Sequence, residues 1–255
     1  MSTVILCQIR QAGQPFYVND AGVSLYSAEE LCWFMENNLP LLDRAFFEEP
    51  LQKWLRDELG MERLAGTLET LQKKPGGPLL EELALAVYDE AGWLFAGERD
   101  AAAARLREQE RLPVPVRRKL RADCLAGYRK YMLAIRLYRE ILADGEGTGQ
   151  LAGMLWHNMG VSYARMFQMD EACDCFRKAW DLLQGQASLK SLLYCCALRG
   201  GQEDFDRMAD DCGADMAFRQ ELEDHLRALT EKELPEDLDA ALRGWVQQYH
   251  EETGL

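Results

Sequence analysis

The 255-residue sequence lacks long apolar runs and the N-terminal pattern of a secreted protein. No stretch approaches the roughly 20 consecutive apolar residues that a helix needs to cross a bilayer. The short apolar run near the start has no basic residues before it, which makes a poor signal peptide. We therefore expect a soluble protein located in the cytoplasm.

Basic residues are in short supply: 29 Lys and Arg stand against 43 Asp and Glu, for a formal net charge of −14. Such a chain would repel duplex DNA on average, and anionic membrane surfaces for the same reason. A basic segment of a partner would be attracted during encounter. We expect no nucleic acid and no membrane partner, and we keep a basic protein or peptide segment as one option.

The common catalytic motifs are absent as well. The three histidines, His157, His225 and His250, form no HExxH pair, and the glycines at 76–77 and 145–149 lack the Lys-Ser/Thr tail of a phosphate loop. Neither a GxSxG nor an HRD motif occurs. We predict no catalytic residue, no cofactor and no enzyme activity, although groups assembled in three dimensions escape a linear motif search.

Eight cysteines are present, but they lie in apolar helical or strand patterns rather than in a loop-rich disulfide framework. Cys173, Cys175 and the pair Cys195-Cys196 raise the question of a metal site. Helical neighbours one or two positions apart point in different directions, which disfavours shared ligation. We expect reduced thiols and no metal, and this again favours the cytoplasm.

The most informative stretch covers residues 151–183, LAGMLWHNMGVSYARMFQMDEACDCFRKAWDLL. Steps of three and four place two sets of apolar and small residues on one helical face each. The first set is Leu155, Trp156, Met159, Gly160, Tyr163 and Ala164, and the second is Ala172, Cys175, Phe176, Ala179, Leu182 and Leu183. Asp170 can cap the second helix. Since Gly160 and Ala172 are small, we predict a closely packed antiparallel αα-hairpin.

Seven of these residues have the spacing W-x2-L-G-x2-Y…A-x3-F-x2-A, namely Trp156, Met159, Gly160, Tyr163, Ala172, Phe176 and Ala179. The stretch therefore resembles a tetratricopeptide repeat over about 34 residues. Met159 stands where the family has leucine, and Gln184 stands where its proline is usual. The resemblance implies a stack of helical hairpins.

A repeat of this kind needs neighbours, because one hairpin cannot bury both of its faces. Upstream, the pattern recurs at an offset of 38 positions in Ala122, Leu125, Ala134 and Tyr138. Pro115 suits the first turn of that earlier hairpin, and residues 144–149 can accommodate the extra length. Downstream, the helical pattern of residues 189–209 is interrupted at Gly200-Gly201, and Tyr194 stands where the repeat is expected to have a small residue. We interpret this segment as a degenerate repeat or cap.

The strongest break in the chain is Lys74-Pro75-Gly76-Gly77-Pro78. Before it, residues 1–75 predict a small α/β region, with short strands near 4–9, 16–18 and 23–26 followed by a helix that a Ser27/Glu30 capping box opens. After it, residues 78–255 predict helices throughout, with Asp100 as the cap of an alanine-rich one. The expected fold is mainly α: a tetratricopeptide-like α-solenoid with a small α/β N-terminal cap.

The segment YSAEELCWFMENNLPLLD, residues 26–43, is similar to the opening of some uncharacterised proteins of Gram-positive anaerobes. This resemblance implies a bacterial source. It brings no known activity.

The inner face of such a stack is lined by the first helix of each hairpin, and a peptide could lie along it. Asn158 matches the place where repeats that clamp a peptide carboxylate carry an asparagine, but the basic residues such clamps need are not clearly presented. A helix-capping or loop-bonding role for Asn158 and a surface role for His157 are alternatives, and the whole set could be ordinary exposed positions. The candidate peptide-binding residues are Lys119, Asp123, Met154, His157, Asn158, Val161 and Arg165.

These observations favour a non-catalytic intracellular scaffold that binds a protein or peptide on a concave face. One alternative is a regulatory sensor for a short signalling peptide or small ligand. Another is self-assembly into a homo-oligomer, in which a second copy covers apolar residues such as Trp33 and Trp245.

Overall fold

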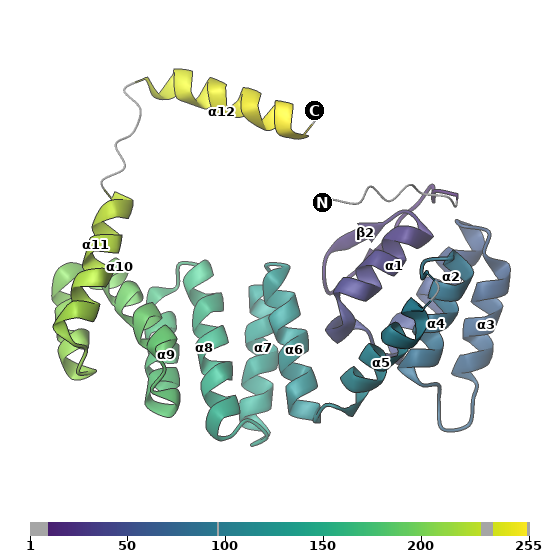
Figure 1. The fold of residues 1–255 in the computed structure, drawn as a ribbon, viewed down its shortest axis with the longest axis horizontal. Helices are drawn as coiled ribbons and strands as arrows, with labels where there is room; N and C mark the ends of the chain where they lie inside the picture. The colour runs from purple at the N-terminus through teal and green to yellow at the C-terminus, as the bar shows by residue number, and fades with distance from the viewer. Residues whose placement is uncertain (1–9, 96, 231–236, 254–255) are drawn as a thin grey trace. The chain divides into compact units, whose positions relative to one another are not determined.

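The computed structural model describes residues 10–95, 97–230 and 237–253 (Figure 1). Helices make up 75% of these residues and strands 3%, so the expectation of a mainly helical fold is confirmed. No helix in the described ranges is long and apolar enough to cross a bilayer. The chain divides into two compact units, Met1–Ser188 and Leu189–Leu255. The Lys74–Pro78 break is a loop inside the first unit, and a domain boundary there stays a prediction.

A two-stranded antiparallel sheet opens the described part of the first unit. Strands β1 (Phe16–Val18) and β2 (Val23–Leu25) pair with Phe16 opposite Leu25 and Val18 opposite Val23. Gly22 closes the connecting turn in the left-handed region, with φ of 71°. The two predicted strands at 16–18 and 23–26 are confirmed, and the one predicted at 4–9 lies outside the described residues.

Helix α1 (Ala28–Asn37) begins at the predicted cap, because the Ser27 hydroxyl accepts a hydrogen bond from the Glu30 N–H at 3.2 Å. The Glu30 carboxylate accepts from the N–H of Tyr26 at 2.6 Å, one residue before the position that a regular capping box uses. The apolar stripe of α1, including Leu31 and Phe34, is fully buried.

Helices then alternate with short connections through the rest of the N-terminal half. They are η1 (Leu39–Leu41), η2 (Arg44–Phe47), α2 (Glu49–Asp57), α3 (Glu62–Gln72), α4 (Leu80–Ala91) and α5 (Glu98–Arg111). Helix α4 packs on α1, α3 and α5. Asp100 was expected to cap the alanine-rich helix, but that prediction is wrong: α5 starts earlier, with Gly97 at the N-cap, and Asp100 lies in its first turn.

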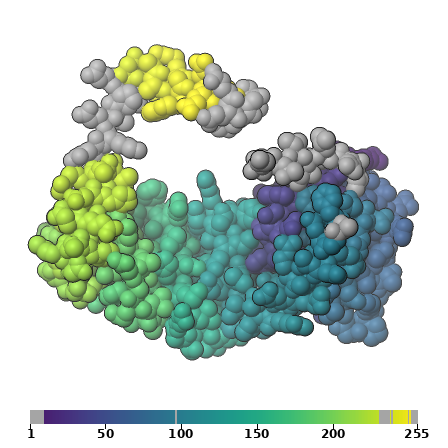
Figure 2. Space-filling model, viewed as in Figure 1, coloured from purple at the N-terminus to yellow at the C-terminus, as the bar shows by residue number. Residues whose placement is uncertain are grey.

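Four helices follow as two hairpins, α6 (Val114–Gly127) with α7 (Tyr131–Ala143), and α8 (Gly149–Arg165) with α9 (Met169–Leu183). Each helix packs on the next one along the chain (Figure 1). In the space-filling view, side chains close the gaps between these ribbons (Figure 2). Pro115 lies at the start of α6, as predicted.

Helices α8 and α9 pack closely against each other, as the small residues Gly160 and Ala172 predict. A Cβ atom placed on Gly160 would come within 2.8 Å of the Phe176 ring, so only glycine allows this approach. Ala172 and Phe176 are buried in the same interface. Two predictions for α9 are wrong. Asp170 lies in the first turn while Gln168 holds the N-cap, and Leu182 is 49% exposed because it falls beside the buried stripe.

The turns inside the two hairpins repeat each other. Arg129 and Phe167, which are 38 residues apart, both follow the first helix of a hairpin with left-handed φ of 60° and 59°. The N–H groups of Lys130 and Gln168 donate back to the carbonyls of Leu125 and Tyr163, at 2.9 and 3.1 Å. The two turns therefore have the same backbone hydrogen bonds at the same sequence offset.

The second unit contains most of α10 (Gln186–Asp211), together with α11 (Met216–Thr230) and α12 (Leu238–Thr253). Gly201, with φ of 70°, kinks α10 at the predicted Gly-Gly break. The Tyr194 hydroxyl lies 2.6 Å from His225 Nδ1, which joins α10 to α11. Pro235, expected to open the last helix, lies outside the described residues.

Candidate functional site

The carboxylate of Asp123 joins three helices of the first unit. It accepts hydrogen bonds from Lys119 Nζ at 2.6 Å, the Tyr138 hydroxyl at 2.7 Å and Asn158 Nδ2 at 2.7 Å. Lys119 and Asp123 lie one turn apart on α6, Tyr138 comes from α7, and Asn158 comes from α8. We call these four residues the Asp123 network.

Burial keeps the Tyr138 hydroxyl protonated in this network. Lys119 is only 8% exposed and Tyr138 is fully buried. Burial, and then the negative charge of Asp123, raises the pKa of Tyr138 well above its usual value, so its hydroxyl stays protonated and donates. The Lys119 ammonium balances the Asp123 carboxylate at 2.6 Å. Lys119 is nearly buried and Asp123 is partly exposed, so breaking this pair would leave the Lys119 charge without compensation in a largely buried position.

A cleft of about 410 Å³ opens beside the network, where the C-terminal ends of α6 and α8 and the start of α7 meet. This α6–α8 cleft is lined by Asp123, Ala126, Gly127, Arg129, Tyr131, Tyr138, Asn158, Val161, Ser162 and Arg165. Its volume is within the range typical of small-ligand and side-chain pockets.

Two arginines give the α6–α8 cleft its charge. Arg129 and Arg165 are both exposed, and neither forms an ion pair within the part of the chain that the structure describes. Asp123 is the one carboxylate among the lining residues, and Lys119 already balances it. The cleft thus presents two uncompensated cations beside the apolar Val161, on a chain whose overall charge is −14.

Four of the seven predicted site residues lie together in this cleft: Asp123, Asn158, Val161 and Arg165. Asn158 neither caps a helix nor bonds a loop with its amide, which donates to Asp123. Lys119 reaches the site only through its contact with Asp123. The Asn158 amide and the Lys119 ammonium therefore already have a partner within the protein, the Asp123 carboxylate.

The other two predicted residues lie apart from the cleft. Met154 is 38% exposed and is not among the lining residues. The surface position considered for His157 is wrong: its ring is half-buried, with Nδ1 3.0 Å from Ser188 Oγ and the ring centroid 5.4 Å from that of Phe176. Burial lowers the pKa of His157, so the ring is neutral near pH 7.

Sequence patterns missed Arg129, Tyr131 and Ser162 as lining residues. Arg129 follows α6 in a left-handed backbone conformation. Glycine is the usual residue at such a position, so an arginine there is not expected from the sequence. Tyr138 was recognised only as a packing position. A polar residue on an otherwise apolar stripe is the signal that could have identified a buried network, and Lys119, three residues before the buried Ala122 on the same helical face, is such a case.

No group of three or more His, Cys, Asp or Glu side chains that could hold a metal ion occurs among the described residues. The arrangement at the cleft offers hydrogen-bond donors and positive charge. It is suited to holding an oxygen-rich group of a ligand. No family model matches the chain, and neither a curated protein nor a solved structure matches it.

Proposed function

We propose that this chain is a non-catalytic binding protein that holds a segment of a protein or peptide in the α6–α8 cleft. The observation that carries the proposal is the pair of uncompensated cations, Arg129 and Arg165, beside Val161 at the mouth of a cleft of about 410 Å³. The Asp123 network holds one wall of the cleft in place, so the entropy cost of binding falls mainly on ordering the exposed Arg129 and Arg165 side chains.

We also propose that the two hairpins are repeats of a short tetratricopeptide-like solenoid. The support is the 38-residue offset, which the apolar pattern, the two left-handed turns at Arg129 and Phe167, and their backbone hydrogen bonds all share. The close approach of Gly160 to Phe176 is of the kind that the repeat spacing implies. In such a solenoid, first helices such as α6 and α8 line the binding face.

The charge pattern indicates what the bound segment presents. Arg129 and Arg165 would donate to carbonyl or carboxylate oxygens of the segment. Basic residues elsewhere in the partner would be attracted over longer range by the net charge of −14. A segment with an acidic or polar residue at the cleft and a basic flank satisfies both requirements.

The proposal is tested with peptides selected against the purified protein from a random display library. Their affinity is then measured by fluorescence anisotropy for the wild type and for the double variant Arg129→Glu, Arg165→Glu. Loss of two charge-assisted contacts should weaken binding by roughly 100-fold or more, at about 1.5 kcal/mol each.

The control is Arg136→Glu, which makes one of the two Arg→Glu changes on α7, away from the α6–α8 cleft. It should keep the wild-type affinity within about threefold, because a distant surface charge has a small effect. If the control weakens binding as much as the cleft variant, or if no selected peptide is sensitive to the cleft variant, the proposal fails.

Self-assembly is a second candidate function, and the exposure of two tryptophans favours it. Trp33 is 50% exposed and Trp245 is 53% exposed, whereas tryptophan is usually covered in a monomer. Sedimentation velocity over a concentration series should then show a dimer or larger species that Trp33→Ser or Trp245→Ser weakens. A monomer at every concentration would exclude this candidate.

A further inference from the structure

A second cleft lies in the first unit, between residues 40–48, the start of α4, the end of α5 and the first turns of α6. Its volume is about 610 Å³. Four arginines line it, and we call it the arginine cleft: Arg44 comes from η2, and Arg117, Arg118 and Arg121 come from α6. Glu48 and Glu110 are also in the lining.

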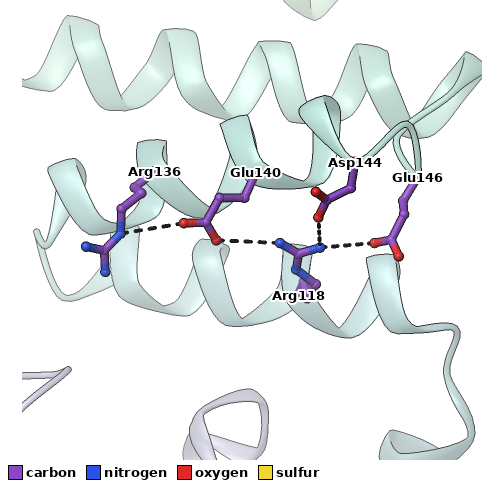
Figure 3. Close-up of polar contacts among 5 residues, drawn as sticks. All are labelled: Arg118, Arg136, Glu140, Asp144 and Glu146. Carbon is purple, nitrogen blue, oxygen red and sulfur yellow. Dashed lines mark hydrogen bonds and ion pairs between the residues drawn. The ribbon is translucent and has the colours of Figure 1, made fainter.

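Two of the four arginines are already neutralised. Arg121 donates to Asp20 at 2.5 Å and to Asp43 at 3.2 Å. Arg118 donates to three carboxylates, those of Glu140, Asp144 and Glu146 (Figure 3), at 3.5, 2.6 and 3.1 Å.

These carboxylates come from α7 and the segment that follows it, so Arg118 is drawn toward that side of α6 (Figure 3). Its hydrogen bonds to Asp144 and Glu146 raise the pKa of Arg118 above its usual value. Both Arg118 and Arg121 therefore act as structural ion pairs at the margin of the arginine cleft.

Arg117 and Arg44 are different, because neither has a carboxylate partner in the described part of the chain. The Nε atom of Arg117 is buried and has no hydrogen-bond acceptor there. A buried donor without an acceptor is costly, and such a donor in a native fold calls for an explanation. The Arg44 guanidinium has one weak contact, with the Gly76 carbonyl at 3.4 Å.

The backbone adds to this positive charge. Helix α6 begins at Val114, its first turn holds no acidic residue, and Arg117 and Arg118 follow directly. A helix N-terminus carries a partial positive charge, which disfavours cations placed there. Asp144 and Glu146 offset this for Arg118, at 2.6 and 3.1 Å, but no carboxylate in the described residues pairs with Arg117. An anionic ligand beside Arg117 would also lie close to the first turn of α6, where the helix carries its partial positive charge.

We propose that the arginine cleft binds a small phosphate ester that also carries hydroxyl groups, as a sugar phosphate does. Arg117 and Arg44 bind the phosphate oxygens, since a guanidinium matches them with paired N–H donors.

Of the three lining carboxylates, Asp43 is paired with Arg121, and Glu110 accepts a hydrogen bond from the Leu80 N–H at 3.2 Å. Glu48 would repel a bare anion, and a ligand hydroxyl donating to it offsets that repulsion. The volume of about 610 Å³ accommodates a ligand of this size.

Isothermal titration calorimetry with glucose 6-phosphate, inorganic phosphate and glucose tests the proposal on the full chain. Glucose 6-phosphate should bind more tightly than inorganic phosphate, and glucose should give no heat. Arg117→Gln and Arg44→Gln should each weaken glucose 6-phosphate binding by about 10-fold or more, the equivalent of one lost charge-assisted contact.

Arg177→Gln, on α9 and outside the arginine cleft, is the control and should leave the affinity unchanged, because its partner Asp181 contacts no arginine of the cleft. Because Arg44 is exposed, its variant is expected to fold even if the Arg117 variant does not. No binding of glucose 6-phosphate at millimolar concentration would overturn the proposal, as would binding that both variants leave intact. Equal affinity for inorganic phosphate would contradict the assignment to a hydroxyl-bearing ester.

Discussion

Asp123 shows what the sequence reveals at the scale of single residues. Its spacing from Lys119 is visible in the sequence and predicts an i, i+4 pair. Its bond to Asn158, 35 residues away, depends on how α6 and α8 are set side by side. Residue types and local spacing therefore predicted members of the site, while their contacts required the packing of the hairpins.

Removing the Asp123 carboxylate should destabilise the protein. In Asp123→Ala the buried Lys119 side chain loses its carboxylate partner, so the free energy of unfolding should fall by about 3 kcal/mol. Asp57→Ala, which removes an exposed i, i+4 partner of Lys53, is the control and should cost at most about 1 kcal/mol. Urea unfolding measures both, and equal effects would show that the Asp123 network adds no stability.

Gly160→Ala should be destabilising, because the new Cβ would come within 2.8 Å of the Phe176 ring. Gly66 lies inside α3 with nothing within 4 Å of a Cβ. Gly66→Ala should therefore stabilise the protein by about 0.5 to 1 kcal/mol, the difference in helix propensity. Thermal unfolding should give melting temperatures shifted in opposite directions. Similar shifts for both variants would contradict the close α8–α9 contact.

Burial lowers the pKa of His157 from its ordinary value of 6.5, which predicts a pH dependence of stability. Between 6.5 and the lower folded pKa, the unfolded chain binds a proton that the folded chain does not. Stability therefore falls as the pH drops through this window. His157→Gln should lose less stability than the wild type between pH 7 and 5, as measured by urea midpoints. Parallel curves would mean that His157 titrates normally.

At the scale of elements, apolar periodicity predicted the helices better than single residues predicted their ends. The buried stripe of α1 and the two hairpins follow from steps of three and four. Asp100 and Asp170 failed as caps because the N-cap is set by the backbone angles of one residue. Gly97 and Gln168 occupy that position instead, and Asp100 and Asp170 lie in the first turn.

The left-handed turns after α6 and α8 give a prediction at this scale. A residue with a Cβ is strained at positive φ, so Phe167→Gly should stabilise the protein by up to about 1 kcal/mol. Arg129→Gly should have a similar effect on stability and yet weaken peptide binding, because it removes a cation from the α6–α8 cleft. Denaturant unfolding and anisotropy separate the two effects. Unchanged peptide binding in Arg129→Gly would show that Arg129 does not contribute to the binding site.

At the scale of the whole molecule, the sequence predicted a mainly helical chain and the small strands near its start. It marks Lys74–Pro78 as the strongest break, whereas the two compact units divide at Ser188, in the part of α10 that precedes the Gly201 kink. No proline or glycine stands at Ser188 to mark that division. Composition also shows the net charge of −14 without showing where uncompensated arginines gather, since ion pairing depends on the packed helices.

The most direct test of the central claim is to map a selected peptide onto the isotope-labelled protein by NMR. The account predicts that the largest chemical-shift changes occur at the guanidinium groups of Arg129 and Arg165 and at the side-chain amide of Asn158. Changes confined to helices α2 and α3, with the α6–α8 cleft unaffected, would contradict it.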